Sequence, residues 1–385
     1  MATELTFTTT DSDWTPPTSY PDLSDRSMIA IDLETRDPNI KKTGPGWPTK
    51  DGEIVGIAVA TDGFKGYFPI AHERGDNLDP AMTMKWFQKV MSSDADKICH
   101  NASYDIGWCR ASGIKTNGKI IDTMLAGAII DENRRGYSLN ALSAEYLGEI
   151  KSEVKLREKA EEWGLDAKAD LWKLPPSFVG EYAEQDAELT LKLWRKFETE
   201  IRLQNLSSIF EMETKLLPIL IEMREHGIRM DMNKAEVMKK TFVTEEKKKL
   251  HEIKGLTGVD VELWAATSVA KAFDAMKVPY DRTEKTKAPS FTTNWLHNCT
   301  HPLAKLVREA REMNKFHSTF IDSIFKFEHK GRIHAEINQL RSDNGGTVTG
   351  RLSMSNPNLQ QVPARNKEFG KQIRSLFLPD EDKQW

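Results

Sequence analysis

Two carboxylates stand one residue apart where an apolar run ends. Residues 27–39 read SMIAIDLETRDPN, so Asp32 and Glu34 close what reads as a buried strand. Because residues i and i+2 of a strand point to the same face, both side chains should share one small volume. Two like charges that close repel and raise each other's pKa, so something cationic must hold them there. For such a pair on its own, an acidic surface turn is the simpler explanation.

Further oxygen ligands come from two other segments. HNASYD places Asp105 at the start of an expected helix, directly after a short strand-like run. YAEQDAELT places Tyr182 and Asp186 four residues apart, on one face of a helix. Hard oxygen ligands of this kind suit Mg²⁺ or Mn²⁺ better than zinc. Together with the first pair, they predict a site for divalent metal ions.

Taken in order, D-x-E-T, N-x-x-Y-D and Y-x-x-x-D resemble the three motifs of the DEDDy 3′–5′ exonucleases, the proofreading domain of family A DNA polymerases. IIDTML and YSLNALSAEYLG resemble the segments between the second and third motifs. The resemblance implies that Asp32 bridges two metal ions while Glu34 and Asp186 complete the first site. Asp105 would support the second. Two cations about 4 Å apart clamp an in-line phosphoryl displacement, in which water attacks and the 3′-oxygen leaves.

The same resemblance gives roles to three neighbours of the carboxylates. Tyr182 would orient or deprotonate the attacking water. Thr35 and Asn101 match positions that contact the terminal nucleotide, although Thr35 could simply end the strand and Asn101 could bond a neighbouring backbone group. Tyr104 is expected to pack, and His100 to be satisfied in the core.

TVTGRLSMSNPNLQQVPARN, residues 347–366, resembles the T-G-R-L-S-S-x-x-P-N-L-Q-x-[IV]-P-x-R segment of family A DNA polymerases. The resemblance implies that Thr349 and Arg351 approach the minor groove of a primer–template. Asn358 and Gln360 would contact the template-side duplex, and Arg365 the phosphate path. Because the minor groove presents similar acceptors at every base pair, such contacts check pair geometry without reading sequence.

Charge is unevenly distributed along the chain. The formal net charge is −4, yet the stretch from Arg341 to Arg374 holds six basic residues against two acidic ones, a balance of +4. A local basic stripe favours phosphate binding. Without the motif in this stretch, a solvated basic face would explain it equally well. Met354 departs from the family pattern, which usually has serine or alanine there.

The composition is that of an ordinary globular protein. Of 385 residues, 39% are apolar and 29% charged, and the length suggests two or three domains. No apolar run approaches the ~20 residues of a membrane helix, and the first residues lack a secretion signal. Cys99, Cys109 and Cys299 read as reduced thiols. We therefore expect a cytoplasmic protein, acting in the host cytoplasm if it is viral.

The order of the elements predicts an α/β protein. Residues 1–24 form an expected extended arm. Strand-like runs and helical patterns then alternate, which with the resemblance predicts a ribonuclease H-like exonuclease domain over 25–205, a mixed sheet flanked by helices. Residues 206–385 are mainly helical and are expected to form a thumb and the first strands of a polymerase palm.

The sequence ends in LPDEDKQW, before the D-Y-S-x-I-E, fingers-helix and H-D motifs that the resemblance would continue with. We therefore expect the proofreading exonuclease part of a family A DNA-directed DNA polymerase, of phage or viral type. It would bind single-stranded 3′ ends and primer–template DNA and would polymerise only with a second polypeptide. A split gene, an intein or intron, and an incomplete record all remain open as explanations.

Two other functions are disfavoured. A stand-alone DEDDy exoribonuclease would lack the T-G-R-L-S element, which is present. A non-catalytic replisome or DNA-binding subunit would need a lost carboxylate, and none is lost.

Overall fold

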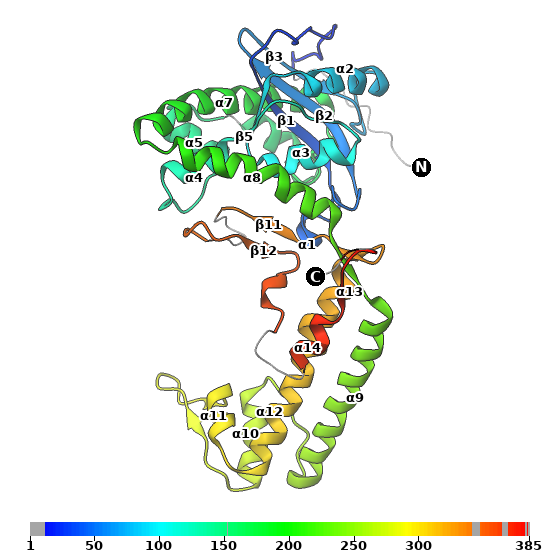
Figure 1. The fold of residues 1–385 in the computed structure, drawn as a ribbon, viewed down its shortest axis with the longest axis vertical. Helices are drawn as coiled ribbons and strands as arrows, with labels where there is room; N and C mark the ends of the chain where they lie inside the picture. Colours follow the sequence, from blue (N-terminus) through cyan, green and yellow to red (C-terminus); the bar gives the residue numbers. More distant parts are fainter. Residues whose placement is uncertain (1–11, 152, 341–346, 364–368, 382, 384–385) are drawn as a thin grey trace. The chain divides into compact units, whose positions relative to one another are not determined.

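The computed structural model describes residues 12–151, 153–340, 347–363, 369–381 and 383 (Figure 1). The chain divides into two compact units. The first comprises Met1–Gly227 with His334–Asn356, and the second Ile228–Ile333 with Pro357–Trp385.

The first unit is built on a five-stranded mixed sheet with the order β3-β2-β1-β4-β5. β1–β2 and β2–β3 pair antiparallel, whereas β1–β4 and β4–β5 pair parallel. The strands are β1 (Met28–Arg36), β2 (Glu53–Thr61), β3 (Phe64–Pro69), β4 (Asp96–Cys99) and β5 (Ile120–Asp122). The predicted mixed α/β fold is confirmed.

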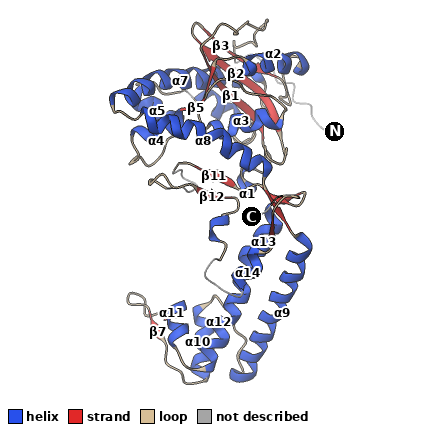
Figure 2. Ribbon diagram, viewed as in Figure 1, coloured by secondary structure: helices blue, strands red, loops and turns tan. Residues whose placement is uncertain are grey.

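Helices cover both faces of this sheet (Figure 2). α4, α5 and α7 build one core with it, whereas α2, α3 and α8 build the other. The helical segments are α1 (Ile40–Thr43), α2 (Pro80–Ser92), α3 (Ala102–Ala111), α4 (Thr123–Ile130), α5 (Leu139–Tyr146), α6 (Val154–Glu162), η1 (Leu171–Lys173), α7 (Pro176–Leu203) and α8 (Ser207–His226). A short hairpin of β11 (Glu336–Asn338) and β12 (Ser353–Ser355) belongs to the same unit.

The side chains of β1 point alternately into the two cores on either side of the sheet. Ile29, Ile31 and Leu33 pack into the core with α2, α3 and α8, whereas Ala30 packs into the core with α7. Because side chains alternate along a strand, Asp32 and Glu34 lie on the face of Ala30. The strand therefore directs both carboxylates toward the side of the sheet that α7 covers.

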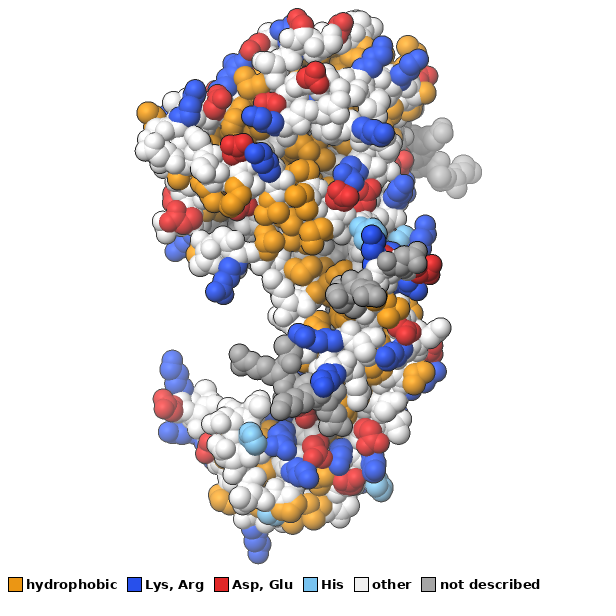
Figure 3. Space-filling model, in the orientation of Figure 1, with side chains coloured by type: hydrophobic (Ala, Val, Ile, Leu, Met, Phe, Trp, Pro, Cys, Tyr) orange, Lys and Arg blue, Asp and Glu red, His pale blue; other side chains and the backbone are white. Residues whose placement is uncertain are grey.

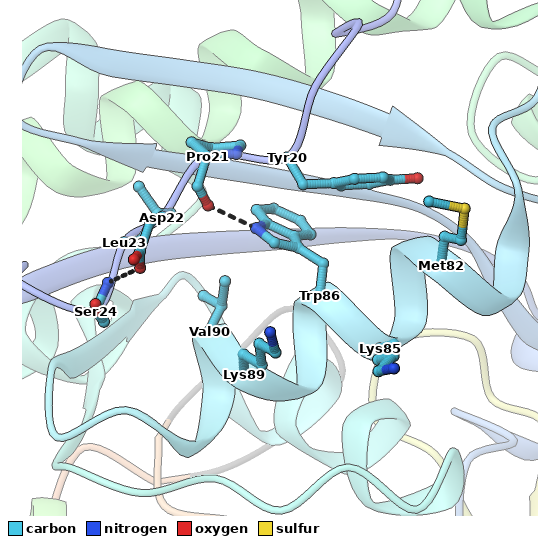
Figure 4. A pocket seen from close by; sticks show the side chains of 10 residues that line it. All are labelled: Tyr20, Pro21, Asp22, Leu23, Ser24, Met82, Lys85, Trp86, Lys89 and Val90. Carbon is cyan, nitrogen blue, oxygen red and sulfur yellow. Dashed lines mark hydrogen bonds between the residues drawn. The ribbon is translucent and has the colours of Figure 1, made fainter.

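The arm that precedes β1 is fastened to the first unit by aromatic residues. Trp14 Nε1 donates to Glu184 Oε1 at 3.0 Å, and Trp86 Nε1 of α2 donates to the Pro21 carbonyl at 2.8 Å. Residues 20–24 and α2 line a cavity of about 580 Å³ (Figure 4). No site carboxylate lines it.

α8 has two different faces. Leu217 and Ile221 are buried in the core that α8 shares with α2 and α3. Elsewhere on the helix, apolar side chains are exposed, among them Met212, Ile219 and Met223, and hydrophobic groups gather over α8 in Figure 3.

The second unit is mainly helical and is organised around α9 and α12, which pack together. A small sheet with the order β13-β6-β10-β9 accompanies them. Its elements are β6 (Ile228–Met230), α9 (Met232–Thr257), α10 (Ala266–Ala275), β7 (Asp281–Arg282), β8 (Pro289–Ser290), α11 (Thr293–Asn298), α12 (Pro302–Lys315), the π-helix η2 (Phe316–Ile321), α13 (Asp322–Phe327), β9 (Glu328–His329), β10 (Arg332–Ile333), η3 (Leu359–Gln361), α14 (Phe369–Arg374) and β13 (Phe377–Leu378). Among the described residues, no helix is long and apolar enough to cross a membrane.

Candidate active site

The end of β1 carries the first two carboxylates. Asp32 pairs with Ala58 of β2 and Glu34 with Gly56, and the register shifts directly after Glu34. Both acidic residues are partly exposed, unlike the buried Leu33 between them. They thus share one face at the edge of the core, where solvent reaches part of each side chain.

Asp105 joins this strand from the first turn of α3. It is buried, and its Oδ1 accepts a hydrogen bond from the Leu33 backbone N–H at 3.0 Å. Asp122 holds the start of the same helix, because its two oxygens accept from the backbone N–H groups of Asn101 and Ala102 at 3.0 and 2.9 Å. These contacts fix Asp105 against the backbone that separates the first two carboxylates.

Tyr182 and Asp186 lie one turn apart on α7, and both contact a lysine. Lys151 Nζ donates to Asp186 Oδ2 at 2.6 Å and to the Tyr182 hydroxyl at 3.0 Å. Asp186 Oδ1 is buried and has no hydrogen-bond partner. The sequence reasoning missed Lys151. Its loop, between α5 and α6, carries no motif that would distinguish this lysine from a surface one.

The carboxylates act on one another electrostatically. Burial, and after it the charge of Asp186, raise the pKa of Asp32 to about 7, whereas Lys151 opposes the rise. Burial and the charge of Asp32 likewise raise the pKa of Glu34 and of Asp105 well above their usual values. Without a compensating cation, the site therefore retains protons at pH values where exposed carboxyls have lost them.

The donor chemistry of these residues fits divalent metal ions. All the donors are hard oxygens, and the buried Asp186 Oδ1 lacks a partner that a cation would provide. The side chains are not yet arranged as metal ligands, because no group of three or more Asp, Glu, His or Cys side chains within the described residues converges closely enough to hold an ion.

The polar residues next to the carboxylates differ in whether their side chains are already hydrogen-bonded. A hydrogen bond of 2.5 Å joins Thr35 Oγ1 and the Tyr104 hydroxyl. Asn101 adopts a left-handed conformation at φ 74° and exposes its side chain. His100 bonds the Thr123 hydroxyl and the Tyr137 carbonyl with its two ring nitrogens, and burial lowers its pKa to about 4. His100 is thus satisfied as a neutral residue.

The predicted DNA-contact residues lie apart from this site in the sequence and fall in both units. Thr349 and Arg351 are exposed in the first unit. Asn358 and Gln360 are exposed in the second, where Asn358 Oδ1 accepts from the Gln360 backbone N–H at 3.1 Å. Arg365 lies outside the described residues.

Two family models match the chain. Residues 20–202 match the 3′-5′ exonuclease, and residues 232–385 match DNA polymerase family A.

Curated relatives agree with these matches. A DNA-directed DNA polymerase of Pseudomonas phage M6 is 35% identical over 98% of this chain and 59% of its own. DNA polymerase DpoZ of Salmonella phage PMBT28 is 31% identical over 95% of this chain and 60% of its own. The chain thus spans about three fifths of the length of these relatives.

A solved structure shares the fold. It is the POL domain of Pol1 from M. smegmatis, in complex with DNA primer-template and dNTP. The TM-score is 0.68 at 20% identity, covering 92% of this chain and 55% of that one.

The raised pKa of Asp32 predicts a pH-dependent response to metal. Below about pH 7 the folded site holds a proton that the unfolded chain loses near pH 4, so without metal the stability falls as pH rises through that window. A bound Mn²⁺ would compete with this proton for the carboxylate. It should therefore raise the melting temperature more at pH 8 than at pH 5.5, as measured by thermal unfolding.

The double variant Asp32→Asn with Glu34→Gln is the control for this response. It keeps the shapes of both side chains but removes their charges, so Mn²⁺ should no longer shift its melting temperature. An equal Mn²⁺ shift at both pH values, or an undiminished shift in the variant, would contradict the assignment.

Proposed function

Because the chain joins a 3′-5′ exonuclease domain to a segment of DNA polymerase family A, we propose that it hydrolyses the 3′-terminal phosphodiester of DNA and serves in proofreading. The observation that carries this proposal is that α7 packs against β1. Asp32 and Glu34 project from β1 toward the side of the sheet covered by α7, which brings Tyr182 and Asp186. We propose residues 25–205 as the exonuclease domain, after an arm of residues 1–24.

The roles follow from what each side chain can do. Asp32 is proposed to contact two divalent ions, Mg²⁺ or Mn²⁺, with Glu34 and Asp186 on the first and Asp105 on the second. Such ions, when bound, supply the charge that activates water and stabilises the leaving 3′-oxygen. The protein's part is to hold four carboxyl groups ionised and close together, which only compensation by positive charge permits.

Tyr182 is proposed to orient the attacking water. Burial, and after it the charge of Asp186, raise the pKa of Tyr182 well above its usual value, so the phenol keeps its proton. A protonated phenol acts through a hydrogen bond and does not serve as a base. The exposed amide of Asn101 and the hydroxyl of Thr35 are proposed to contact the terminal nucleotide.

The second half is proposed to bind primer–template duplex. Residues 206–385 would form the thumb and the first palm strands. Thr349 and Arg351 would approach the minor groove, Asn358 and Gln360 the template side, and Arg365 the phosphates. The support is the family A match over residues 232–385 together with the exposure of the four described side chains.

The place of action is proposed to be the cytoplasm of a bacterial host. The support is the phage origin of the relatives and the three free cysteines.

The first test replaces the carboxylates of β1. Asp32→Ala with Glu34→Ala should slow Mn²⁺-dependent release of mononucleotides from single-stranded DNA by orders of magnitude, since both oxygen donors of the strand are lost. Tyr182→Phe should cost less, about 10-fold to 100-fold, because it removes one orienting hydroxyl. Glu188→Ala, at a partly exposed position of α7, is the control and should leave the rate unchanged. Undiminished hydrolysis by the double variant would refute the proposed site.

The second test concerns duplex binding. Arg351→Ala with Arg365→Ala should weaken binding to primed duplex and flatten its salt dependence, because fewer counterions are released. Cleavage of short single strands should stay unchanged. Arg195→Ala, which removes an exposed arginine of α7, should alter neither property. Equal losses on duplex and single strands would show that the two activities share one site.

Primer extension is proposed to need carboxylates that these 385 residues do not supply, whether the same chain or a second polypeptide carries them. Nucleotidyl transfer requires its own carboxylate pair for two metal ions, and the complete set in this sequence is assigned to hydrolysis. The purified chain carrying Asp32→Ala, which protects products from degradation, should therefore not extend a primed template with dNTPs and Mg²⁺. Templated extension by this chain alone would contradict the proposal.

A further inference from the structure

Lys151 is a buried lysine directed at two residues of the candidate active site. Its residue is 8% exposed, although lysine is almost never so buried unless it is paired. Nζ lies 2.6 Å from Asp186 Oδ2 and 3.0 Å from the Tyr182 hydroxyl, and 4.3 Å from the centroid of the Tyr182 ring. One ammonium group therefore contacts both α7 side chains to which hydrolysis is assigned.

The lysine is held in turn by Glu153. Nζ lies 3.5 Å from Glu153 Oε1, and Glu153 is itself buried and accepts from Arg157 Nε at 2.9 Å. A group that only filled space in the core would not need two carboxylates and a hydroxyl. The ammonium is thus held by Glu153 as well as by the two side chains of α7.

The two carboxylate oxygens of Asp186 have different surroundings. Oδ2 is occupied by Lys151, whereas Oδ1 is buried without a hydrogen-bond partner. The charge of Asp186 raises the pKa of Asp32, so the carboxylate lies within electrostatic reach of the β1 acids. Lys151 can therefore stay on Oδ2 while Oδ1 remains available to a cation shared with β1.

The same ammonium sets the direction of the Tyr182 hydroxyl. Because Nζ donates to the phenol oxygen, the phenol's own proton must point away from Lys151. Tyr182 and Asp186 also share a side-chain hydrogen bond, so this proton points toward the carboxylate. Both α7 side chains are oriented by one cation that need not touch the substrate.

We propose that Lys151 is a positioning residue for the hydrolysis, an inference that rests on the proposed exonuclease function. It holds the Asp186 carboxylate and the Tyr182 hydroxyl in the orientation that turnover requires. Because it carries the same sign of charge as a divalent ion, it also opposes metal binding. Lys151 therefore lowers the affinity for metal and raises the turnover rate. A residue that only supports the fold would not act on the two properties in opposite directions.

The test compares Lys151→Met with Lys151→Arg. Methionine keeps the length and apolar contacts of the side chain but removes the charge and the donors, whereas arginine keeps both. Lys192→Met is the matched control, because Lys192 is a partly exposed lysine of α7 that also contacts carboxylates, Glu149 at 2.8 Å and Glu188 at 3.3 Å. Mn²⁺ affinity is measured by electron paramagnetic resonance, and kcat and KM on a single-stranded oligonucleotide.

The expected pattern is opposite changes in binding and turnover. Lys151→Met should bind Mn²⁺ about 3-fold to 10-fold more tightly, because a nearby positive charge is gone. Its kcat should fall about 10-fold to 100-fold with little change in KM. Lys151→Arg should recover most of kcat, and Lys192→Met should match the parent protein in both measurements. If Lys151→Met does not fold, as judged by circular dichroism, Lys151→Gln takes its place.

Two results would overturn the inference. Weaker Mn²⁺ binding together with lower kcat, unrestored by arginine, would mean that Lys151 only maintains the fold. An active parent protein whose kcat and Mn²⁺ affinity are unaltered by Lys151→Met would reject this role and leave the exonuclease function standing. An inactive parent protein would instead overturn the proposed function itself, whatever the Mn²⁺ measurements show.

Discussion

Repulsion among gathered carboxylates is the constraint on which the rest of this site depends. Burial raises the pKa of Asp32 and Glu34, and neighbouring charges add to it: Asp186 acts on both residues, and Asp32 acts on Glu34. Only positive charge or protons can relieve such a cluster. Lys151 on Asp186 and, at longer range, Lys168 oppose the rise in the pKa of Glu34, but they do not cancel it and leave the β1 carboxylates to mobile cations. The chemistry proposed here follows from that incomplete compensation.

The secondary structure brings the charges together despite their repulsion. The alternation of β1 puts Asp32 and Glu34 on one face, and the 3.6-residue turn of α7 puts Tyr182 above Asp186. Asp105 is tied to the Leu33 backbone by a hydrogen bond. Three elements, β1, α3 and α7, thus hold the acids, with apolar cores on both sides of the sheet. The folding energy of the first unit therefore opposes the repulsion.

Local periodicity explains what the sequence could predict. A strand period of two puts Asp32 and Glu34 on one face, and a helical spacing of four puts Tyr182 and Asp186 on one face, before any tertiary structure is known. The alternation of strands and helices gives the α/β class. Lys151 was not predictable in this way, because its partners are 31 and 35 residues away and its loop has no pattern. The sequence also could not predict that His334–Asn356 belongs to the first unit, because the residues before and after this segment belong to the second unit.

The most direct test of this account is a crystal structure of the chain with Mn²⁺, read through the anomalous scattering of the metal. The account predicts two Mn²⁺ peaks about 4 Å apart between β1 and α7. Asp32 should contact both ions, Asp186 should bind through Oδ1, and Lys151 should remain on Oδ2. Mn²⁺ peaks only elsewhere on the protein, or an Asp186 still bound to Lys151 with no metal beside Asp32, would contradict the claim that these carboxylates are gathered to hold metal ions.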